Sequence, residues 1–405
     1  MVDPHIVVFS SLFPSQVQPG AGLFVRERMF RVGRHFPISV VAPTPWFPFQ
    51  DMLRRIKPHF RPGAPTYERQ SGIDVWYPRF LSIPSLLKTF DGLMMALGAF
   101  SHMRRLKHEG RLDIIDAHFA YPDGYAASLL SRWLEVPFTI TLRGTETRHI
   151  HDARLGKKLL QAIKQAAQVF SVSESLRTLV ISHGAPPDKI EVVGNGVDAI
   201  RFSVRDRTAC RTALCLSRES KVLVSVGGLV PRKGFHRVIE LLPKLRQQFP
   251  DLIFLIIGGG STEGNNRVEL ENQVKRLNLE GCVRFLGSIA SDELPSILSA
   301  ADVFVLATSN EGWANVFLEA MACGLPVVTT AVGGNQEVVC EASLGTVVPF
   351  GDSEALAKAI KDSFIRSWDR AYIRSYAEKN SWDERVTRLC QHFLLIAQGP
   401  EGQHE

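Results

Sequence analysis

The sequence predicts a two-domain α/β protein in which each domain is built on a doubly wound parallel sheet. The chain of 405 residues is longer than one ordinary hydrophobic core supports, so two domains are expected. Hydrophobic residues make up 45% and charged residues 22%, the balance of a folded globular protein. Short apolar runs alternate with longer amphipathic runs, and strand–helix–strand repeats of this kind form parallel sheets with right-handed crossovers.

The runs that we assign to strands are apolar throughout, which is typical of parallel strands covered by helices on both faces. The run 252–257 is the clearest example. The expected strands are 5–9, 38–42, 113–117, 137–142, 168–172, 190–193, 221–227, 252–257, 283–286, 302–306 and 326–329, and the expected helices of the second half include 235–248, 267–278 and 292–300.

The alternation restarts after 195–198, and this restart sets the predicted domain boundary. We expect an N-terminal domain over 1–194 and a C-terminal domain over 195–380. A final helix is expected over 381–397, and residues 398–405 are expected to be a flexible tail.

Charge and composition limit the possible partners and compartments. The formal net charge of +6 suggests an anionic partner: a phosphate, a nucleotide, nucleic acid or an acidic membrane surface. No nucleic-acid-binding motif accompanies the charge, so we expect no nucleic acid partner. The six cysteines form no C-x-x-C pair, and no signal peptide or long apolar span is found. We therefore expect a cytoplasmic protein with reduced thiols.

The first candidate site follows the expected strand 221–227. Gly227 and Gly228 let the backbone turn closely, and Arg232 and Lys233 follow just before a helix. Backbone amides and two cations in this position suit a diphosphate. A tight turn with two solvated cations is the alternative interpretation.

The second candidate site is the segment from Glu311 to Glu319, which follows the expected strand 302–306. A helix is expected to begin near Ala314, and the free amides of its first turn would attract an anion. Glu319 could accept hydrogen bonds from ribose hydroxyls. The alternative is a capping carboxylate and a surface glutamate. The other donor-binding candidates of this segment are Gly312, Trp313, Asn315 and Val316.

Further candidates lie just beyond other strands, where ligands of parallel α/β sheets bind. Gly258 and Gly259 begin a glycine-rich loop that could close over a base or phosphate, although a flexible connection is equally consistent. In the first half, the candidates are Gly20 and Gly22, His118 and Asp123, and Arg143. The alternatives are turn glycines, a hydrogen-bonded structural histidine, and an Arg143–Glu146 pair.

Metal binding is not predicted. The chain contains no Asp-x-Asp, so paired aspartates holding a metal-bridged diphosphate are not supported. Cations and helix dipoles would have to offset the diphosphate charge instead.

Four motifs together resemble one known family. The Glu311-x7-Glu319 segment, Pro231–Gly234, Asn195–Asp198 and the stretch Phe24–Arg28 are similar to those of the retaining glycosyltransferases of family 4, which have the GT-B fold. The resemblance covers nearly the whole chain in the expected order. It implies two Rossmann-like domains facing a cleft, with a nucleotide-sugar held mainly by the C-terminal one and the acceptor by the N-terminal one.

The resemblance also implies roles for individual residues. Lys233 matches the lysine that neutralises the donor diphosphate, and Glu319 matches the glutamate that binds ribose. Glu311 matches the glutamate near the donor sugar, and His118 matches a histidine of the first domain. The amides around 314–316 would contact the phosphates, the final helix would return to the N-terminal domain, and no metal or other cofactor is implied.

Two positions depart from the family pattern. Many members carry an arginine where this chain has Gly228, and Arg232 could substitute for it. Many members carry a histidine where this chain has Arg143, which could instead recognise an anionic acceptor, and Asp123 is a further candidate for acceptor binding. A catalytic role tied to that histidine therefore cannot be transferred.

The predicted function is retaining transfer of a sugar, of hexosyltransferase type, from a nucleotide-diphosphate sugar to a glycan or lipid-linked acceptor in cell-surface polysaccharide synthesis. The alternatives are a GT-B nucleotide-sugar epimerase or hydrolase and a non-catalytic sugar-nucleotide-binding subunit. The basic, aromatic segment 46–65, with Arg54 and Arg61, and the stretch 94–107 could touch the anionic inner face of the membrane. A solvated loop and an ordinary amphipathic helix are the alternatives.

Overall fold

The chain forms two compact units in the computed structural model, which describes residues 3–48, 50, 52, 63, 65–83, 88–261 and 263–399. The N-terminal unit consists of Met1–Asn195 together with Asp383–Glu405, and the C-terminal unit of Gly196–Trp382. Arg54, Arg61 and most of the predicted basic loop lie outside the described residues, as do residues 400–405 of the predicted tail.

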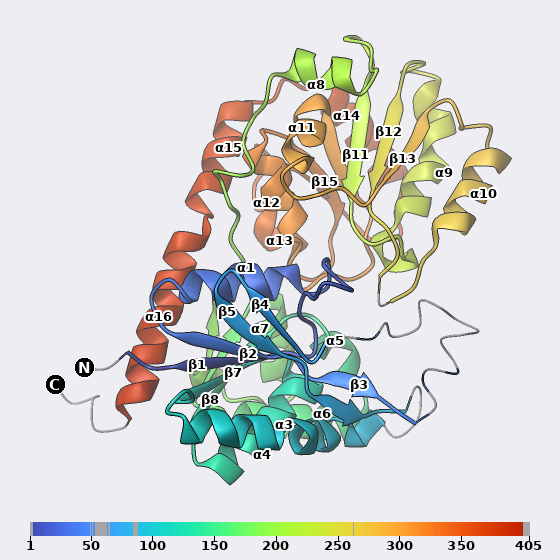
Figure 1. The fold of residues 1–405 in the computed structure, drawn as a ribbon. Helices are drawn as coiled ribbons and strands as arrows, with labels where there is room; N and C mark the ends of the chain where they lie inside the picture. Colours follow the sequence, from blue (N-terminus) through green and yellow to red (C-terminus); the bar gives the residue numbers. More distant parts are fainter. Residues whose placement is uncertain are drawn as a thin grey trace. The chain divides into compact units, whose positions relative to one another are not determined.

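The N-terminal unit contains an eight-stranded sheet with the order β10-β9-β8-β7-β1-β2-β5-β4 (Figure 1). All neighbouring strands are parallel except β4 and β5, which are antiparallel. The strands are β1 (Ile6–Phe9), β2 (Ile38–Val41), β4 (Tyr67–Gln70), β5 (Ile73–Trp76), β7 (Ile114–His118), β8 (Phe138–Leu142), β9 (Gln168–Ser171) and β10 (Ile190–Val192), and β3 (Thr44–Trp46) pairs separately with β6 (Arg79–Leu81).

Helices cover this sheet because its central strands are apolar on both faces. All residues of β1 and β8 are buried. The helices are α1 (Leu23–Val32), α3 (Asp91–His108), α4 (Tyr125–Leu134), α5 (Glu146–His149), α6 (Ala153–Gln165), α7 (Glu174–Ser182) and α16 (Trp382–Gln398). The last of these packs on β9, where the Phe393 and Phe170 rings lie 6.1 Å apart.

The C-terminal unit is a six-stranded, all-parallel sheet with the order β13-β12-β11-β14-β15-β16. The strands are β11 (Val222–Val226), β12 (Ile253–Ile257), β13 (Val283–Gly287), β14 (Val303–Leu306), β15 (Val327–Thr330) and β16 (Gly345–Val348). The helices are α8 (Arg207–Ala213), α9 (Phe235–Arg246), α10 (Arg267–Arg276), α11 (Leu294–Ala300), α12 (Asn315–Ala322), α13 (Asn335–Val338), α14 (Ser353–Ile365) and α15 (Arg370–Lys379).

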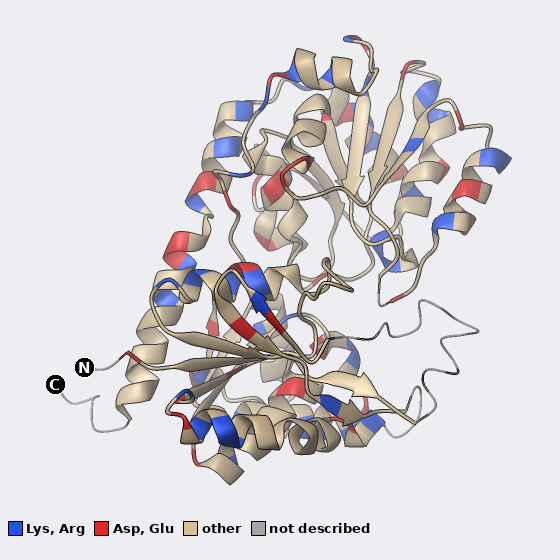
Figure 2. Cartoon of the chain, viewed as in Figure 1, with Lys and Arg blue, Asp and Glu red and all other residues tan. Residues whose placement is uncertain are grey.

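Alternate residues of each strand of this sheet enter two separate cores. Val222 and Val224 pack with residues of α11 and α12, whereas Leu223 packs with residues of α9 and α14. A strand that fills a core on both faces consists mainly of apolar residues. Accordingly, Lys, Arg, Asp and Glu lie mainly on the helices and loops of this unit (Figure 2).

Strand order reverses at one place in each sheet, between β1 and β7 in the N-terminal unit and between β11 and β14 in the C-terminal unit. Adjacent loops leave the sheet in opposite directions at such a point and leave a crevice at the carboxyl ends of the strands. The residues that follow these four strands are therefore the first candidates for a site.

All eleven predicted strands overlap observed strands, and the predicted α/β class is confirmed. Five strands escaped prediction, namely β3, β4, β5, β6 and β16. The segment 46–65 is predicted to be a long loop with at most one helical turn, but its first residue, Trp46, is the last residue of β3. In the described part of the chain, no helix is both long and apolar enough to cross a membrane.

Candidate functional site

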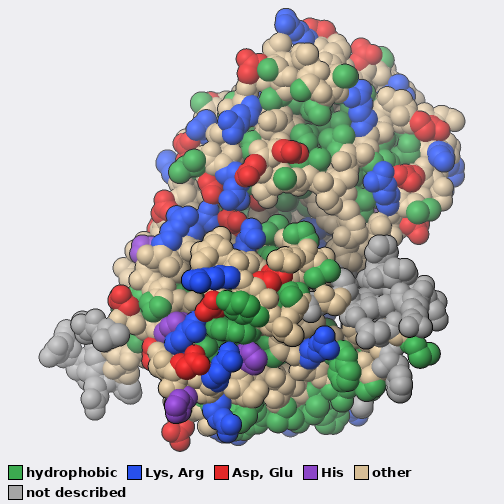
Figure 3. Space-filling model, in the orientation of Figure 1, with side chains coloured by type: hydrophobic (Ala, Val, Ile, Leu, Met, Phe, Trp, Pro, Cys, Tyr) green, Lys and Arg blue, Asp and Glu red, His purple; other side chains and the backbone are tan. Residues whose placement is uncertain are grey.

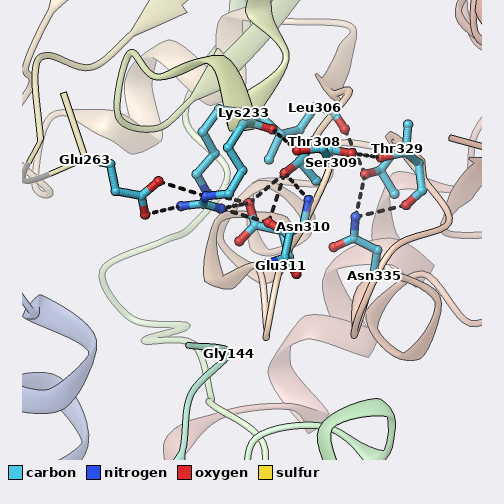
Figure 4. A network of polar contacts seen from close by, with 12 residues as sticks. Gly144, Lys233, Glu263, Leu306, Thr308, Ser309, Asn310, Glu311, Thr329 and Asn335 are labelled. Atoms are coloured by element: carbon cyan, nitrogen blue, oxygen red, sulfur yellow. Dashed lines mark hydrogen bonds and ion pairs between the residues drawn. The ribbon is translucent and has the colours of Figure 1, made fainter. Parts of the chain in front are cut away.

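Two cations and one carboxylate meet at the reversal point of the C-terminal sheet. Beyond β11 a 3-10 turn, Pro231–Lys233, delivers both cations just before α9. Lys233 Nζ lies 2.6 Å from Glu311 Oε1, and Arg232 Nη1 lies 3.2 Å from the same oxygen (Figure 4). The structure therefore brings together residues that the sequence placed after two different strands.

The Glu311 carboxylate is buried, with 7% of the residue exposed. Thr308, which follows β14, donates a hydrogen bond from Oγ1 to Glu311 Oε1 at 3.1 Å. Sequence reasoning missed Thr308, although its position just beyond a predicted strand is the signal that would have found it.

A hydrogen-bonded network fixes the loop that carries Glu311. Thr330 Oγ1 donates to Thr308 O, and Thr329 Oγ1 donates to Leu306 O at 2.8 Å. The side chain of Asn335, which is buried, belongs to the same network, because its Nδ2 donates to Thr330 O at 2.9 Å (Figure 4). The ends of β14 and β15 are thus bound to each other by side chains.

Arg232 is held by a second carboxylate as well. Glu263 accepts from Arg232 Nε at 3.0 Å and from Nη2 at 2.9 Å, a bidentate ion pair. Burial lowers the pKa of Arg232, but the bonds to Glu263 and Glu311 outweigh it, so the net shift is upward. Sequence reasoning did not identify Glu263.

Helix α12 begins beside Glu311 with no side-chain cap, because its N-cap residue is Ala314. Amides at an uncapped helix start attract anions. Gly312 and Ala314 are buried, Asn315 and Val316 are partly buried, and the Trp313 ring packs on the core of this unit. Glu319 lies one turn further along the helix and is also partly buried.

The four candidate glycines of this unit form two touching loops. A Cβ added to Gly258, whose φ is +142°, would lie 1.8 Å from Gly227 O. No L-residue fits such an approach. The amide next to Gly228, that of Leu229, donates to Gly259 O at 2.8 Å. The loops after β11 and β12 are therefore in direct backbone contact.

The N-terminal unit holds its own buried polar cluster. His118 is fully buried, and its Nδ1 accepts from Arg143 Nη2 at 3.0 Å. His118 Nε2 lies 3.3 Å from Asp116 Oδ2, which assigns the ring proton to Nε2. Burial lowers the pKa of His118 to about 4, so the ring is neutral near pH 7. Its predicted catalytic role stays a prediction.

Arg143 is partly buried and contacts three side chains. Beyond His118, its Nη1 donates to Asn195 Oδ1 at 2.9 Å, and its guanidinium carbon lies 5.1 Å from the centre of the Phe24 ring. Burial and the neighbouring cation Arg28 lower the pKa of Arg143. The Arg143–Glu146 side-chain pair that we considered is not formed, because the Glu146 carboxylate accepts from the backbone amides of Arg143 and Gly144.

Asp123 is fully buried at the reversal point of the N-terminal sheet. Its carboxylate accepts from the Ser11 amide and, at 3.0 Å, from Ser11 Oγ, which binds the loop after β7 to the loop after β1. Burial raises the pKa of Asp123 to about 7. Contact between Asp123 and an acceptor stays a prediction.

The first glycine loop contains one position that only glycine fits. Gly22 precedes α1 with φ +65°, and a Cβ there would lie 2.1 Å from Leu12 O. Gly20, by contrast, has open space around it. Their predicted contact with the donor stays a prediction.

Arg28 closes the Phe24–Arg28 motif, to which the sequence analysis gave no role; it is fully buried on α1 and donates to Val193 O at 3.2 Å. Burial lowers the pKa of Arg28 to about 10. Within the described residues, no three His, Cys, Asp or Glu side chains lie together so that they could hold a metal ion.

The chain has two Rossmann-like units, and cations lie where strand order reverses in the second sheet. These features place it in the class of GT-B glycosyltransferases. Residues 206–380 match the family model for glycosyl transferases group 1, and residues 60–201 match the model for glycosyltransferase family 4. The D-inositol 3-phosphate glycosyltransferase of Corynebacterium urealyticum is 30% identical over 342 residues, which cover 79% of this chain and 78% of the relative. The chain belongs to glycosyltransferase family 4.

Other relatives agree with this placement. A putative teichuronic acid biosynthesis glycosyltransferase of Bacillus subtilis is 27% identical over 361 residues, 88% of each chain. The crystal structure of Anabaena HepE in complex with UDP superimposes with a TM-score of 0.74 at 21% identity, covering 96% of this chain and 99% of that one. Sucrose-phosphate synthase of Thermosynechococcus elongatus gives 0.75 at 19% identity, covering 97% and 99%. The GT-B fold predicted from the sequence is confirmed.

Proposed function

We propose that this protein is a retaining hexosyltransferase that moves a sugar from a nucleotide-diphosphate sugar to a glycan or lipid-linked acceptor in cell-surface polysaccharide synthesis. The convergence of Lys233 and Arg232 on Glu311, beside the uncapped start of α12, carries the proposal. The solved complexes of Anabaena HepE with UDP and with UDP-glucose support a donor of this class.

In this reaction the bond between the anomeric carbon and the donor phosphate breaks, and a bond to the acceptor oxygen forms on the same face of the sugar. Negative charge grows on the leaving diphosphate as the sugar becomes oxocarbenium-like. Lys233, Arg232 and the first amides of α12 would stabilise that charge without a metal. The acceptor hydroxyl would give its proton to a phosphate oxygen of the leaving group.

We assign recognition of an anionic acceptor group to Arg143. A desolvated guanidinium gains most from an anion, and burial already lowers the pKa of Arg143. Several relatives are named D-inositol 3-phosphate glycosyltransferases, which fits an acceptor that carries a phosphate. His118 and Asn195 would hold the guanidinium in place.

We also propose that the protein touches an anionic membrane surface through the α3–α4 surface, defined as Phe90, Leu97, Phe100, Arg104 and Trp133. Phe90, Leu97 and Trp133 are 49%, 53% and 40% exposed. Arg104 lies over the Phe100 ring at 5.7 Å. Hydrophobic side chains gather along this lower edge of the unit in Figure 3. Exposed aromatic and aliphatic groups beside cations suit the headgroup region of an acidic leaflet.

Vesicle flotation tests the membrane proposal. The protein should float with phosphatidylglycerol-containing vesicles and not with pure phosphatidylcholine, and Leu97→Asp should abolish flotation. Ile200→Asp is the matched control, because Ile200 is 92% exposed on the C-terminal unit. Equal flotation of both variants would contradict the proposal.

A thermal-shift screen of nucleoside diphosphates and their sugars tests the donor assignment. At least one nucleoside diphosphate should raise the melting temperature in the presence of EDTA. Incubation of that donor with lipid and glycan extracts, followed by NMR of the product, should show an unchanged anomeric configuration. Rapid loss of the donor without any acceptor would instead favour an epimerase or hydrolase.

A further inference from the structure

The guanidinium of Arg232 already makes four polar contacts with the protein itself. Glu263 accepts from Nε and Nη2, at 3.0 and 2.9 Å, while Nη1 donates to Asn310 O at 2.8 Å and lies 3.2 Å from Glu311 Oε1 (Figure 4). Arginine binds phosphate through the same two-donor edge that Glu263 fills. Glu263 must therefore release this edge of Arg232 before a phosphate can bind to it.

The charges of this cluster cancel. Arg232 and Lys233 supply two positive charges, and Glu263 and Glu311 supply two negative ones within ion-pair distance. A diphosphate that approached this intact cluster would meet no net positive charge to attract it. One carboxylate therefore has to leave for the cations to act on the donor.

The two carboxylates differ in how firmly they are held. The Glu311 side chain is 8% exposed and is also bound by Lys233 and Thr308. The Glu263 side chain is 36% exposed and reaches Arg232 from a loop 31 residues further along the chain. Ion pairs near the surface are weaker than buried ones, since water solvates the separated partners. Glu263 is the partner that is easier to displace.

We propose that Glu263 is a built-in competitor for the donor diphosphate, whose carboxylate occupies the phosphate-binding edge of Arg232 until the donor replaces it. This inference rests on the proposed nucleotide-sugar donor and adds a residue that sets its affinity. Glu263 lowers donor affinity and holds Arg232 in a phosphate-ready orientation. It does not take part in bond making or breaking.

Isothermal titration of inorganic pyrophosphate and of UDP, GDP and ADP tests the proposal. Glu263→Gln keeps the side-chain shape and removes the charge, so it should bind pyrophosphate about threefold to tenfold more tightly than the unmodified protein. Glu280→Gln makes the same charge change at an exposed position of the same unit and should alter affinity by less than about 1.5-fold. Unchanged or weaker binding by Glu263→Gln would overturn the proposal.

A double-mutant cycle shows whether Glu263 acts through Arg232. In an Arg232→Gln background, Glu263→Gln should change the pyrophosphate Kd by less than about 1.5-fold, because the competed edge is gone. If Glu263→Gln still increased the affinity for pyrophosphate by its full factor in the Arg232→Gln background, competition at Arg232 would be refuted. If the unmodified protein binds neither pyrophosphate nor any nucleoside diphosphate, the proposed donor class itself is wrong. If it binds them normally and Glu263→Gln leaves the affinity unchanged, only the competition by Glu263 is wrong.

Discussion

One oxygen of Glu311, Oε1, contacts two cations and a hydroxyl. Replacement by alanine would leave Lys233 and Arg232 without this shared partner and remove a carboxylate from the proposed donor-sugar position. We expect Glu311→Ala to lower kcat by about 100-fold or more, the size typical of losing one preorganised polar group. Steady-state assay of sugar transfer measures this.

The matched control for Glu311→Ala is Glu354→Ala, since the Glu354 side chain is 78% exposed. It should leave kcat unchanged, and both variants should keep the far-UV circular dichroism of the original chain. Near-normal turnover by Glu311→Ala would contradict the role assigned to this carboxylate.

Arg143 offers a prediction about the acceptor. Arg143→Ala should raise the acceptor KM about tenfold or more and the donor KM by less than about twofold, because a charge-assisted hydrogen bond to the acceptor is lost. Arg154→Ala, which removes an exposed cation from the same unit, should change neither constant. Equal effects of Arg143→Ala on both constants would refute anionic acceptor recognition.

Asp123 predicts an unusual dependence of stability on pH. Because burial raises its folded pKa from 3.8 to about 7, the folded chain binds the proton more tightly than the unfolded chain. Its stabilising contribution is complete below the unfolded pKa and is lost as pH rises through about 7. The loss is about 1.4 kcal/mol per unit of pKa difference.

The comparison of the original chain with Asp123→Asn isolates this contribution. His118 changes stability in the opposite direction over pH 4 to 6.5, but it does so in both proteins. Urea unfolding should show that the free energy of unfolding of the original chain falls relative to that of Asp123→Asn as the pH rises from 3.8 to about 7. A difference that stays constant across this range would show that Asp123 keeps an ordinary pKa.

At the level of loops, Gly258 lies so close to Gly227 O that no side chain fits between them, and Gly227 N donates to Ile257 O at 3.0 Å. Gly258→Ala should lower the free energy of unfolding by about 2 kcal/mol or more, since the methyl group meets a carbonyl oxygen and the backbone is left-handed. It should also weaken nucleotide binding by displacing the Gly227 loop. Gly281→Ala, with open space at its Cβ, is the control and should be neutral.

The central apolar strands were predicted, whereas the strands that escaped prediction lie at or next to one edge of each sheet or in the separate β3–β6 pair. Central strands such as β11 and β12 are apolar on both faces and stand out in the sequence. Strand β4, Tyr67–Gln70, is a polar edge strand with one buried residue, so its composition resembles a loop. Its pairing with β5 comes from the fold and not from an apolar pattern.

The candidate site, like the strands, could be predicted only in part. Lys233 and Glu311 follow strands that lie side by side, and the rule of strand ends locates both. Glu263 could not be found this way, because its contact with Arg232 depends on the conformation of an irregular loop. Two partners of this cluster were also missed: Asp116, beside His118, lies within a strand, and Asn195, which accepts from Arg143, follows one far along the chain.

Over the whole molecule, each sheet places its polar cluster where strand order reverses. The cluster of the C-terminal unit brings Arg232 and Lys233 beside a helix start, the arrangement on which the proposed diphosphate site rests. The cluster of the N-terminal unit combines Arg143 with a neutral His118, which suits recognition of one anionic group. Membership of glycosyltransferase family 4 agrees with this division.

The most direct test of the central claim is a titration with a nucleoside diphosphate in the presence of EDTA. It compares the affinity of the original chain with that of Lys233→Met. We predict tight binding without metal and a rise in Kd of about tenfold to 100-fold in Lys233→Met, with no change in the exposed control Lys275→Met. Binding that requires a divalent metal, or that is the same in Lys233→Met, would contradict the claim that this lysine and the start of α12 hold the diphosphate.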